Sequence, residues 1–357
     1  MTIAITAQLD RNPWKNKGKQ SSINLYDAIQ NLGEKVCYII ESRNYKNFNK
    51  DHIAYTEENI SQRGAPNVSL LILDGYVPQI DFFEKFLARH PKCRIVHRHE
   101  ENPFAATCSM ISNGTKKPHL EFVGEVWLPP HQIKHKDYIL AFYSKGCIAK
   151  ESPFLWSPFF IHEAQRRFPD KAMRFDPQRQ RGISIMEKNI DFTKNCLFPL
   201  LATERLNIDH PELVDNVSVF NTQALKKTNV IQRFCKGTSI SKQGKLFLSN
   251  DWEAPDIFSK AGQYIVSHQL QSELNYAHLE CLYLDIPLVH NSKSINACGY
   301  YYKKNSLPHA SNQIANALIN HTENLAEYRN SSRELLVKFS PGYRENALIL
   351  EALISGK

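Results

Sequence analysis

The chain has 357 residues and a formal net charge of +8. This length allows two domains, each with its own hydrophobic core. No apolar run reaches the roughly 18 to 20 residues that a membrane span requires, and the N-terminal residues lack the pattern of a signal peptide. We therefore expect a soluble cytoplasmic protein without a membrane partner, whose positive charge favours anionic partners such as nucleotide-sugars or nucleic acid.

The eight cysteines form no CxxC pair and mostly lie inside apolar runs. They predict small buried side chains in a reducing compartment rather than disulfides or zinc ligands. His97 and His99 would leave one strand on the same face, but no third ligand is evident nearby. The sequence therefore predicts no metal site.

Short apolar runs alternate with helical patterns in the N-terminal half, which predicts a parallel doubly wound sheet. This is a Rossmann-like domain without the GxGxxG fingerprint. The expected strands are residues 3–6, 36–40, 70–73, 94–96 and 123–128, and the expected helices are residues 22–32, 80–88 and 131–142.

The segment NPWKNKGKQSS lies between the first expected strand and its helix. A loop at the carboxyl end of a strand faces the ligand crevice, so its basic and amide groups are candidates for contact with phosphate or an acceptor. A lysine-rich loop in solvent is an equal alternative. The candidate residues are Asn16, Gly18, Lys19 and Gln20.

The segment CRIVHRHEENPF places several proton acceptors after the fourth expected strand. Glu100, Glu101 or His99 could take a proton from an attacking hydroxyl there.

Prolines interrupt the aromatic middle of the chain, so that no single helix can cross it. We expect residues 1–175 to form an N-terminal acceptor-side domain and residues 176–340 a C-terminal nucleotide-sugar domain, with residues 341–357 as a helix that returns to the N-terminal domain. The arginines around this boundary favour either a solvated hinge or a rim that binds phosphates. These arginines are Arg166, Arg167, Arg174, Arg179 and Arg181.

The second half starts with a strand at Ile183, followed by Glu187, Asn189 and a helix expected from about Thr193. Lys194 would then lie in the first helical turn, where its charge opposes the helix dipole. This position suggests a phosphate that neutralises the lysine.

Residues 263–292 predict a strand, a helix and a second strand. Ser267, His268 and Asn275 would line the crevice beside the helix, and the helix N-terminus from Ser272 to Asn275 suits a phosphate. Glu273, Tyr276, Glu280 and Tyr283 recur on one face, where a carboxylate suits the hydroxyls of a ribose. The alternative is an ordinary unit whose polar helix face is solvated.

Four ordered blocks resemble a bacterial and phage family without assigned function that is related to GT-B glycosyltransferases. The blocks are ISIMEKNIDFTKNCLFPLLATE, VSHQ..SELNYAHLE..YLDIPLVHNS, EVWLPP..IKHKDYI with PFLWSPFF, and GYYY at residues 299–302. The resemblance spans nearly the whole chain. It implies an α/β fold of GT-B type, in which two Rossmann-like doubly wound domains face a central cleft.

A weaker similarity links the chain to the DNA β-glucosyltransferase of T-even phages. LECLYLDIPLVH resembles the segment with the ribose-binding carboxylate, which implies this role for Glu280. HEENPF resembles the segment with the catalytic aspartate, which implies a base at Glu100 or Glu101, one residue out of register.

The sequence and these resemblances together predict sugar transfer from a UDP-sugar to a hydroxyl, with inversion and without an obligatory cofactor or metal. Glu187, Asn189, Lys194, Ser267, His268, Ser272, Asn275, Tyr276 and Glu280 are the predicted donor-binding residues. The expected acceptor is 5-hydroxymethylcytosine in double-stranded phage DNA, in the host cytoplasm. The alternatives are a bacterial surface glycan, which Trp127, Trp156, Phe159 and Phe160 would stack on, or an inactive nucleotide- or DNA-binding module.

Overall fold

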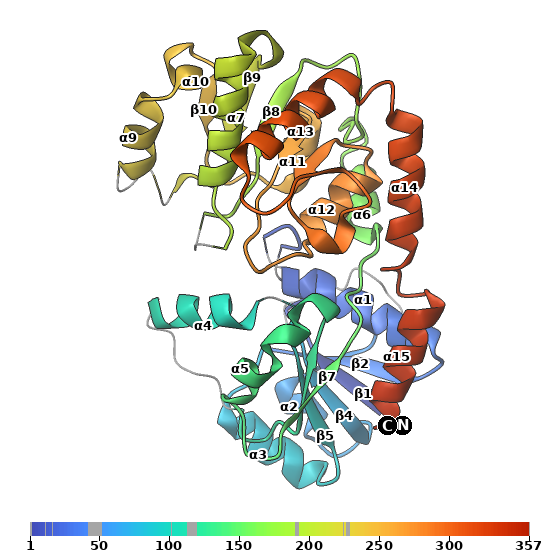
Figure 1. Cartoon of the computed structure of the whole chain (residues 1–357). Coiled ribbons are helices and arrows are strands. Elements are labelled where there is room, and N and C mark those ends of the chain that lie inside the picture. The colour runs from blue at the N-terminus through green and yellow to red at the C-terminus, as the bar shows by residue number, and fades with distance from the viewer. Residues whose placement is uncertain are drawn as a thin grey trace. The chain divides into compact units, whose positions relative to one another are not determined.

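The computed structural model describes residues 2–10, 12–15, 17–41, 52–100, 102–112, 120–189, 193–223, 225 and 229–356. The chain divides into unit 1, comprising residues 1–157 and 338–357, and unit 2, comprising residues 158–337. The N-terminal segment of unit 1 thus ends at residue 157, whereas the sequence predicted a boundary between residues 175 and 176. Figure 1 shows that each unit is a sheet with helices packed on it.

Unit 1 contains a seven-stranded parallel sheet in the order β3-β2-β1-β4-β5-β6-β7. The chain moves outward from β1 on one side and then continues from β4 on the other, so its topological switch point lies between β1 and β4. The strands are β1 (Thr2–Thr6), β2 (Lys35–Ile40), β3 (Ala54–Thr56), β4 (Val68–Leu73), β5 (Arg94–Arg98), β6 (Glu125–Leu128) and β7 (Ile148–Glu151). The helices are α1 (Lys17–Asn31), α2 (Glu57–Ile60), α3 (Ile80–Arg89), α4 (Pro103–Ser112), η1 (Pro130–His135), α5 (Lys136–Leu140) and α15 (Arg344–Ser355).

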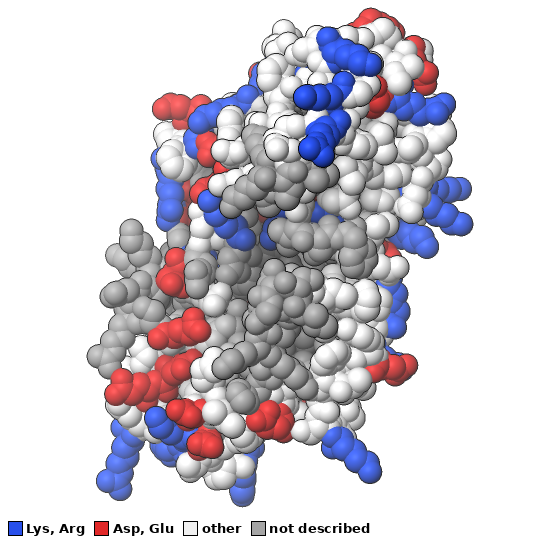
Figure 2. Space-filling view, turned by 90° about the vertical axis from the view of Figure 1, so that its left-hand side faces the viewer, with Lys and Arg blue, Asp and Glu red and all other residues white. Residues whose placement is uncertain are grey.

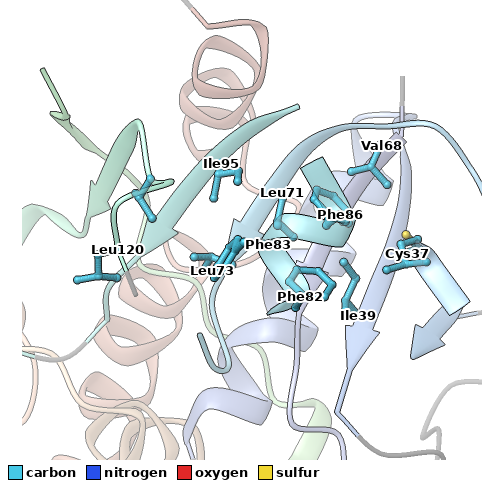
Figure 3. Close-up of a cluster of buried hydrophobic side chains, with 13 residues drawn as sticks. Cys37, Ile39, Val68, Leu71, Leu73, Phe82, Phe83, Phe86, Ile95 and Leu120 are labelled. Carbon is cyan, nitrogen blue, oxygen red and sulfur yellow. The ribbon is translucent and has the colours of Figure 1, made fainter. Parts of the chain in front are cut away.

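The core of unit 1 forms because both faces of its central strands are apolar, as expected for a parallel sheet covered by helices. Phe82, Phe83 and Phe86 lie on one face of α3 at helical spacing. They belong to the same buried cluster as Leu71 and Leu73 of β4, as Figure 3 shows. This packing fixes the positions of β4 and β5, whose carboxyl ends carry the polar groups described below.

Helix α15 packs against α1 in unit 1. Leu350, Leu353 and Ile354 form its buried face, and the guanidinium of Arg94 donates to the carbonyls of Ile354 at 2.8 Å and Leu353 at 3.0 Å. A positive side chain at the last carbonyls of a helix also complements the helix dipole. The C-terminal helix is therefore attached to unit 1 by an apolar face and a charged cap.

Unit 2 contains a six-stranded parallel sheet in the order β10-β9-β8-β11-β12-β13, with its switch point between β8 and β11. The strands are β8 (Gly182–Ile185), β9 (Asn216–Val219), β10 (Leu246–Leu248), β11 (Tyr264–Val266), β12 (Leu288–His290) and β13 (Tyr300–Tyr301). The helices are α6 (Phe159–Arg167), α7 (Leu197–Asp209), η2 (Pro211–Leu213), α9 (Val230–Lys236), α10 (Ser239–Lys242), α11 (Ala254–Lys260), α12 (Tyr276–Tyr283), η3 (Lys293–Ile295), α13 (Leu307–Asn320) and α14 (Leu325–Val337). No helix in the described part of the chain combines the length and apolar character needed to cross a bilayer.

The doubly wound parallel architecture expected from the sequence is confirmed in both units. Two helix starts are different from the prediction. Helix α1 begins at Lys17, five residues before the expected start at Ser22, and α7 begins at Leu197 rather than near Thr193. As a result, Lys19 and Gln20 lie inside α1, and Lys194 lies before α7 rather than in its first turn.

Candidate functional site

Glu187 joins two loops at the switch point of unit 2, where open parallel sheets form a ligand crevice. It follows β8 and is 5% exposed, and its carboxylate accepts from the Ser267 hydroxyl at 2.5 Å and the His268 backbone N–H at 3.2 Å. The Gln269 side-chain amide donates to its other oxygen at 2.7 Å. Ser267, His268 and Gln269 directly follow β11, so this carboxylate organises the ends of the two strands beside the switch point.

Ser267 also links these loops to α12 and β13. Because its hydroxyl donates to Glu187, it accepts from Nε2 of His278, 2.8 Å away. The Tyr302 hydroxyl donates to the Ser267 carbonyl at 2.8 Å and lies 2.9 Å from Nδ1 of His268, which must then be the donor. Burial lowers the pKa of His268 to about 4, so the imidazole is neutral at pH 7.

Asn189 closes a turn that delays the start of α7. Its backbone has a φ of 55°, its N–H donates to the Lys194 carbonyl at 3.0 Å, and its side-chain oxygen accepts from the Cys196 N–H at 2.8 Å. Lys194 therefore lies in this turn and not in the first turn of α7, which corrects the sequence prediction. Lys194 is nevertheless 8% exposed and remains near the carboxyl end of β8.

Helix α12 begins at Tyr276, because the side chain of Asn275 caps it by accepting from the Ala277 N–H at 3.1 Å. Ser272 lies in the preceding loop and is 3% exposed. The alternative of a solvated polar face does not hold for Tyr276 and Glu280, which are only 2% and 3% exposed. Helix α14 and strand β12 pack against α12, so little of its surface can stay polar and hydrated.

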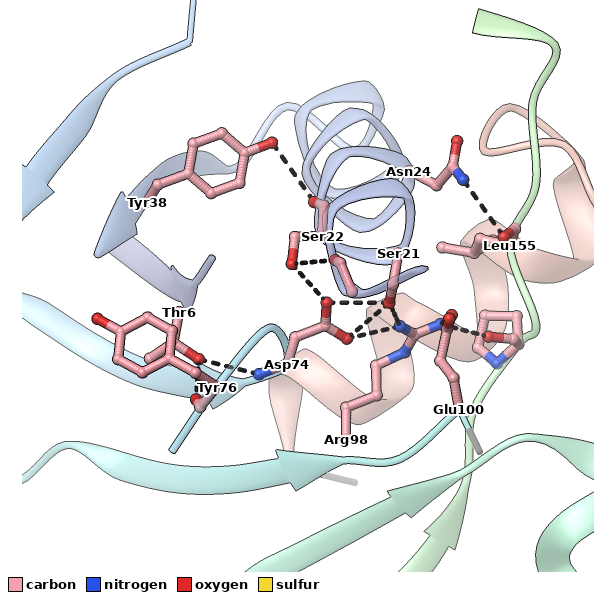
Figure 4. A network of polar contacts seen from close by, with 12 residues as sticks. Thr6, Ser21, Ser22, Asn24, Tyr38, Asp74, Tyr76, Arg98, Glu100 and Leu155 are labelled. Atoms are coloured by element: carbon pink, nitrogen blue, oxygen red, sulfur yellow. Dashed lines mark hydrogen bonds and ion pairs between the residues drawn. The ribbon is translucent and has the colours of Figure 1, made fainter. Parts of the chain in front are cut away.

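Asp74 lies beside the switch point of unit 1, directly after β4. It accepts from Ser22 at 2.7 Å, from Ser21 at 2.9 Å and from the Arg98 guanidinium at 2.7 Å, as Figure 4 shows. The chain can pass close to β1 here because Gly75 has no Cβ, which would lie 2.9 Å from the Cα of Ala7. The cluster joins α1, β4 and β5 through buried charge-assisted hydrogen bonds.

Glu100 belongs to the same cluster. Its carboxylate lies 2.8 Å from the second terminal nitrogen of Arg98, which also donates to the Pro153 carbonyl at 3.2 Å. The residue predicted as the base is thus engaged by a buried guanidinium. Glu101, its predicted alternative, lies outside the described residues.

His99, the third predicted proton acceptor, lies on the opposite side of β5 from Arg98. Its Nε2 is 2.7 Å from the Tyr143 hydroxyl, which is also 2.7 Å from Nδ1 of His97. The two imidazole rings are 4.1 Å apart. The surrounding protein lowers the pKa of His99 to about 4 and the pKa of His97 well below its usual range.

The predicted phosphate loop is partly helical. Gly18, Lys19 and Gln20 lie in the first turn of α1, and Lys19 and Gln20 are 2% and 3% exposed. Lys19 donates to the Leu9 carbonyl, and Gln20 donates to the Pro13 carbonyl at 3.1 Å. These bonds fasten the first turn to the loop before it, which explains the early helix start. Asn16 lies outside the described residues.

Two of the arginines around the expected boundary form contacts within unit 2. Arg174 pairs with Asp285 at 2.9 Å, and Arg179 donates to the carbonyls of Phe258 at 2.9 Å and Ala261 at 2.8 Å.

No cluster of three or more potential metal ligands occurs among the described residues. All eight cysteines are free thiols.

Sequence reasoning did not assign site roles to several members of these clusters. Asp74 could have been found, because it follows the strand that ends at Leu73. Gln269 had the same signal after β11. Tyr143 and His278 could not, because only the tertiary structure brings their side chains to groups far away in the sequence.

The family model described as "Protein of unknown function (DUF2827)" matches residues 72–354. The chain belongs to this family. No curated protein matches the sequence.

Solved structures with similar folds cover the whole chain. A glycosyltransferase from Rickettsia africae ESF-5 matches with a TM-score of 0.57 and 13% identity over 100% of this chain and 99% of its own. An alpha-glucosyltransferase in complex with UDP and a 13-mer DNA matches with a TM-score of 0.57 and 10% identity, over 100% and 99% of the two chains. T4 phage BGT in complex with UDP-glucose matches with a TM-score of 0.51 and 11% identity, over 99% of each chain. At these identities the likeness establishes the fold alone, which is GT-B-like and has two α/β units, each with a parallel sheet.

Proposed function

We propose that this protein transfers a sugar from a UDP-sugar to a hydroxyl acceptor, with the donor bound by unit 2. The observation that carries the proposal is the buried cluster of Glu187, Ser267 and Gln269 at the unit 2 switch point. Such a crevice is the ligand-binding place of open parallel sheets. The full-length likeness to glycosyltransferases of GT-B type supports this chemistry.

The donor would contact residues that surround this cluster. The N-terminus of α12, an eight-residue helix capped by Asn275, and the ammonium of Lys194 offer positive charge to the pyrophosphate. They would stabilise the leaving UDP without an obligatory metal. Glu280 supplies the carboxylate for the ribose hydroxyls, and Asn189 and Glu187 hold the loops. Ser267, His268, Ser272 and Tyr276 would complete the walls of the donor site.

The proposed acceptor is 5-hydroxymethylcytosine in double-stranded DNA, whose base must leave the stack to react. The net charge of +8 favours DNA, and one similar structure contains a DNA 13-mer. A proton acceptor at the carboxyl end of β5, where His99 and Glu100 lie, would activate the hydroxyl for direct displacement with inversion.

An acidic surface limits where DNA can contact unit 1. A cavity of about 710 Å³ is lined by Glu41, Glu57, Glu58 and Asp81. Figure 2 shows acidic side chains gathered on one face of this unit. These carboxylates repel phosphates, so we place the DNA away from α2 and α3.

The test is incubation with a panel of UDP-sugars and duplex DNA that contains 5-hydroxymethylcytosine, followed by nucleoside mass spectrometry. The matched control is the same duplex with unmodified cytosine. We expect a glycosylated nucleoside only with the hydroxymethylated duplex. Calorimetric UDP binding without any glycosylated nucleoside would reject the DNA acceptor. Absence of both transfer and calorimetric UDP binding would refute the proposed function.

A further inference from the structure

His97, Tyr143 and His99 form a continuous chain of hydrogen-bonding side chains at the carboxyl end of β5. Side chains alternate along a strand, so the two histidines share one face while Arg98 points to the other. The Tyr143 hydroxyl lies between the imidazoles at 2.7 Å from a nitrogen of each. These distances are at the short end for hydrogen bonds of this kind.

The three hydrogen-bonded side chains can carry the same number of protons in two different arrangements. A tyrosine hydroxyl has one hydrogen and can accept another, and a neutral imidazole carries one N–H. Tyr143 can therefore donate to one histidine while it accepts from the other. The outer nitrogens, Nδ1 of His99 and Nε2 of His97, have no hydrogen-bond partner within the described part of the chain.

His97 and His99 are partly buried, and the resulting desolvation makes a charged imidazole costly at this position. The surroundings lower the pKa of both histidines, to about 4 for His99. They also raise the pKa of Tyr143, on which the nearby Cys147 thiol acts as well. Within the described residues, no titratable group besides Cys147 and the histidines themselves shifts these pKa values. When a proton binds His99, the release of another proton from His97 therefore avoids a charged imidazole.

We propose that His97, Tyr143 and His99 form a proton relay that removes the acceptor's hydroxyl proton during sugar transfer. The inference rests on the proposed function and names its base. His99 is the catalytic residue in this scheme, because its Nδ1 would touch the acceptor. Tyr143 and His97 are positioning residues that act through His99.

The proton movement balances at each bond. The acceptor O–H bond breaks as its oxygen attacks the anomeric carbon and UDP leaves, and the proton binds Nδ1 of His99. The Nε2 proton of His99 moves to the Tyr143 oxygen, whose own proton moves to Nδ1 of His97. Nε2 of His97 releases its proton to solvent. Between turnovers His97 takes up a proton and His99 releases one, which restores the starting arrangement.

Glu100 has a different role in this scheme. Its carboxylate is held by Arg98, whose guanidinium also binds Asp74. One guanidinium therefore contacts two carboxylates, those of Glu100 and Asp74, on the face of β5 opposite the histidines. Glu100 is therefore engaged in its ion pair with Arg98, and the proton leaves on the histidine face.

The deciding variant is Tyr143→Phe, which removes the central hydroxyl and keeps the ring. Tyr138→Phe is the matched control, because it lies in neighbouring α5 and no hydroxyl bond of Tyr138 occurs within the described residues. We expect single-turnover transfer to fall by roughly 10²-fold or more in Tyr143→Phe, as for the loss of general base catalysis, and to stay at the wild-type rate in Tyr138→Phe. UDP affinity should be unchanged in both variants.

The readout that separates a relay from a structural role is the dependence of the single-turnover rate on the deuterium fraction of the solvent. Several protons in flight give a curved dependence in the wild type, and Tyr143→Phe should make it linear. Wild-type rate in Tyr143→Phe, or a linear dependence in the wild type, would overturn the relay while leaving the proposed function intact.

A second measurement needs no turnover and therefore separates the two proposals. Nitrogen NMR of ring-labelled histidines should show that one of the two nitrogens facing Tyr143 is protonated while the other is bare. Two bare or two protonated nitrogens would contradict the relay. If the wild type transfers no sugar, the proposed function fails, and the NMR result then decides whether the hydrogen-bond chain itself exists.

Discussion

Ser267 and Glu187 hold the ends of β11 and β8 together through a 2.5 Å hydrogen bond at the switch point of unit 2. The same carboxylate accepts from the His268 backbone and the Gln269 side chain. Three donors thus converge on one buried carboxylate and stabilise its charge. The geometry of the loops after β8 and β11 should therefore depend on both oxygens of the Glu187 carboxylate.

Glu187→Gln should therefore disturb both stability and donor binding. The new amide nitrogen would face a donor, either Ser267 or Gln269, and one buried polar group would lose its partner. We expect a loss of about 1–3 kcal/mol in the free energy of unfolding, together with weaker UDP binding by calorimetry. Glu212→Gln is the control, because its side chain is 66% exposed. Unchanged UDP affinity in Glu187→Gln would remove this cluster from the donor site.

Glu280→Ala tests the proposed ribose contact. Losing a charge-assisted hydrogen bond to the nucleotide should weaken UDP binding by about 1.5–3 kcal/mol. Since Glu280 is 3% exposed, we also expect lower stability, unlike for a side chain on a solvated face. Calorimetry with UDP and urea unfolding separate the two effects. Equal UDP affinity in the folded variant would exclude Glu280 as a ligand.

The sequence predicted the fold and the positions of the switch-point loops because the central strands are strongly apolar. It missed the short strands β3, β7, β10 and β13, which have two to four residues and depend on pairing with a neighbour. Glu187 and Ser267 became candidates because each follows a strand that the sequence predicted. The burial of Glu280 was missed because spacing on a helix does not show what packs against it.

His290 should make the stability of unit 2 depend on pH. Burial lowers its pKa to about 4, against about 6.5 in an unfolded chain. Between these values the unfolded state binds the proton more readily, so the stabilisation is complete above pH 6.5 and is lost as the pH falls to about 4. The fully buried ring should contribute up to about 3 kcal/mol of this change.

His290→Gln should consequently narrow the difference in unfolding free energy between pH 7 and pH 5. His210→Gln is the control for replacing an exposed histidine, since its wild-type side chain is 58% exposed. Urea titrations at the two pH values provide the measurement. Identical pH dependence in His290→Gln and the wild type would show that this ring does not titrate with unfolding.

Two leucines of α15 offer a matched test of its attachment to unit 1. Leu353 is 4% exposed and Leu348 is 54% exposed. Leu353→Ala should cost about 2–5 kcal/mol because it leaves a cavity, whereas Leu348→Ala should change stability by at most roughly 0.5 kcal/mol. Deletion after Pro341 removes the whole helix and should abolish transfer. A truncated protein with wild-type turnover would contradict this dependence.

Arg98 and Asp74 form an ion pair at 2.7 Å in which each side chain is 1% exposed. Arg98→Met should cost roughly 3–5 kcal/mol, because it leaves the Asp74 carboxylate buried without its cation. The exposed pair of Arg205 and Asp209 lies 3.7 Å apart. Arg205→Met should cost about 0–1 kcal/mol, which makes it the control for the loss of a guanidinium.

The double variant Arg98→Met with Asp74→Asn identifies the cause of that loss. If the cost comes from an uncompensated charge, removing the carboxylate as well should recover part of it, because Ser21 and Ser22 can still bond to the asparagine oxygen. The free energies of unfolding from urea titrations should then be less than additive by about 1–3 kcal/mol. Additive losses would show that Arg98 stabilises unit 1 through Glu100 and the Pro153 carbonyl rather than through Asp74.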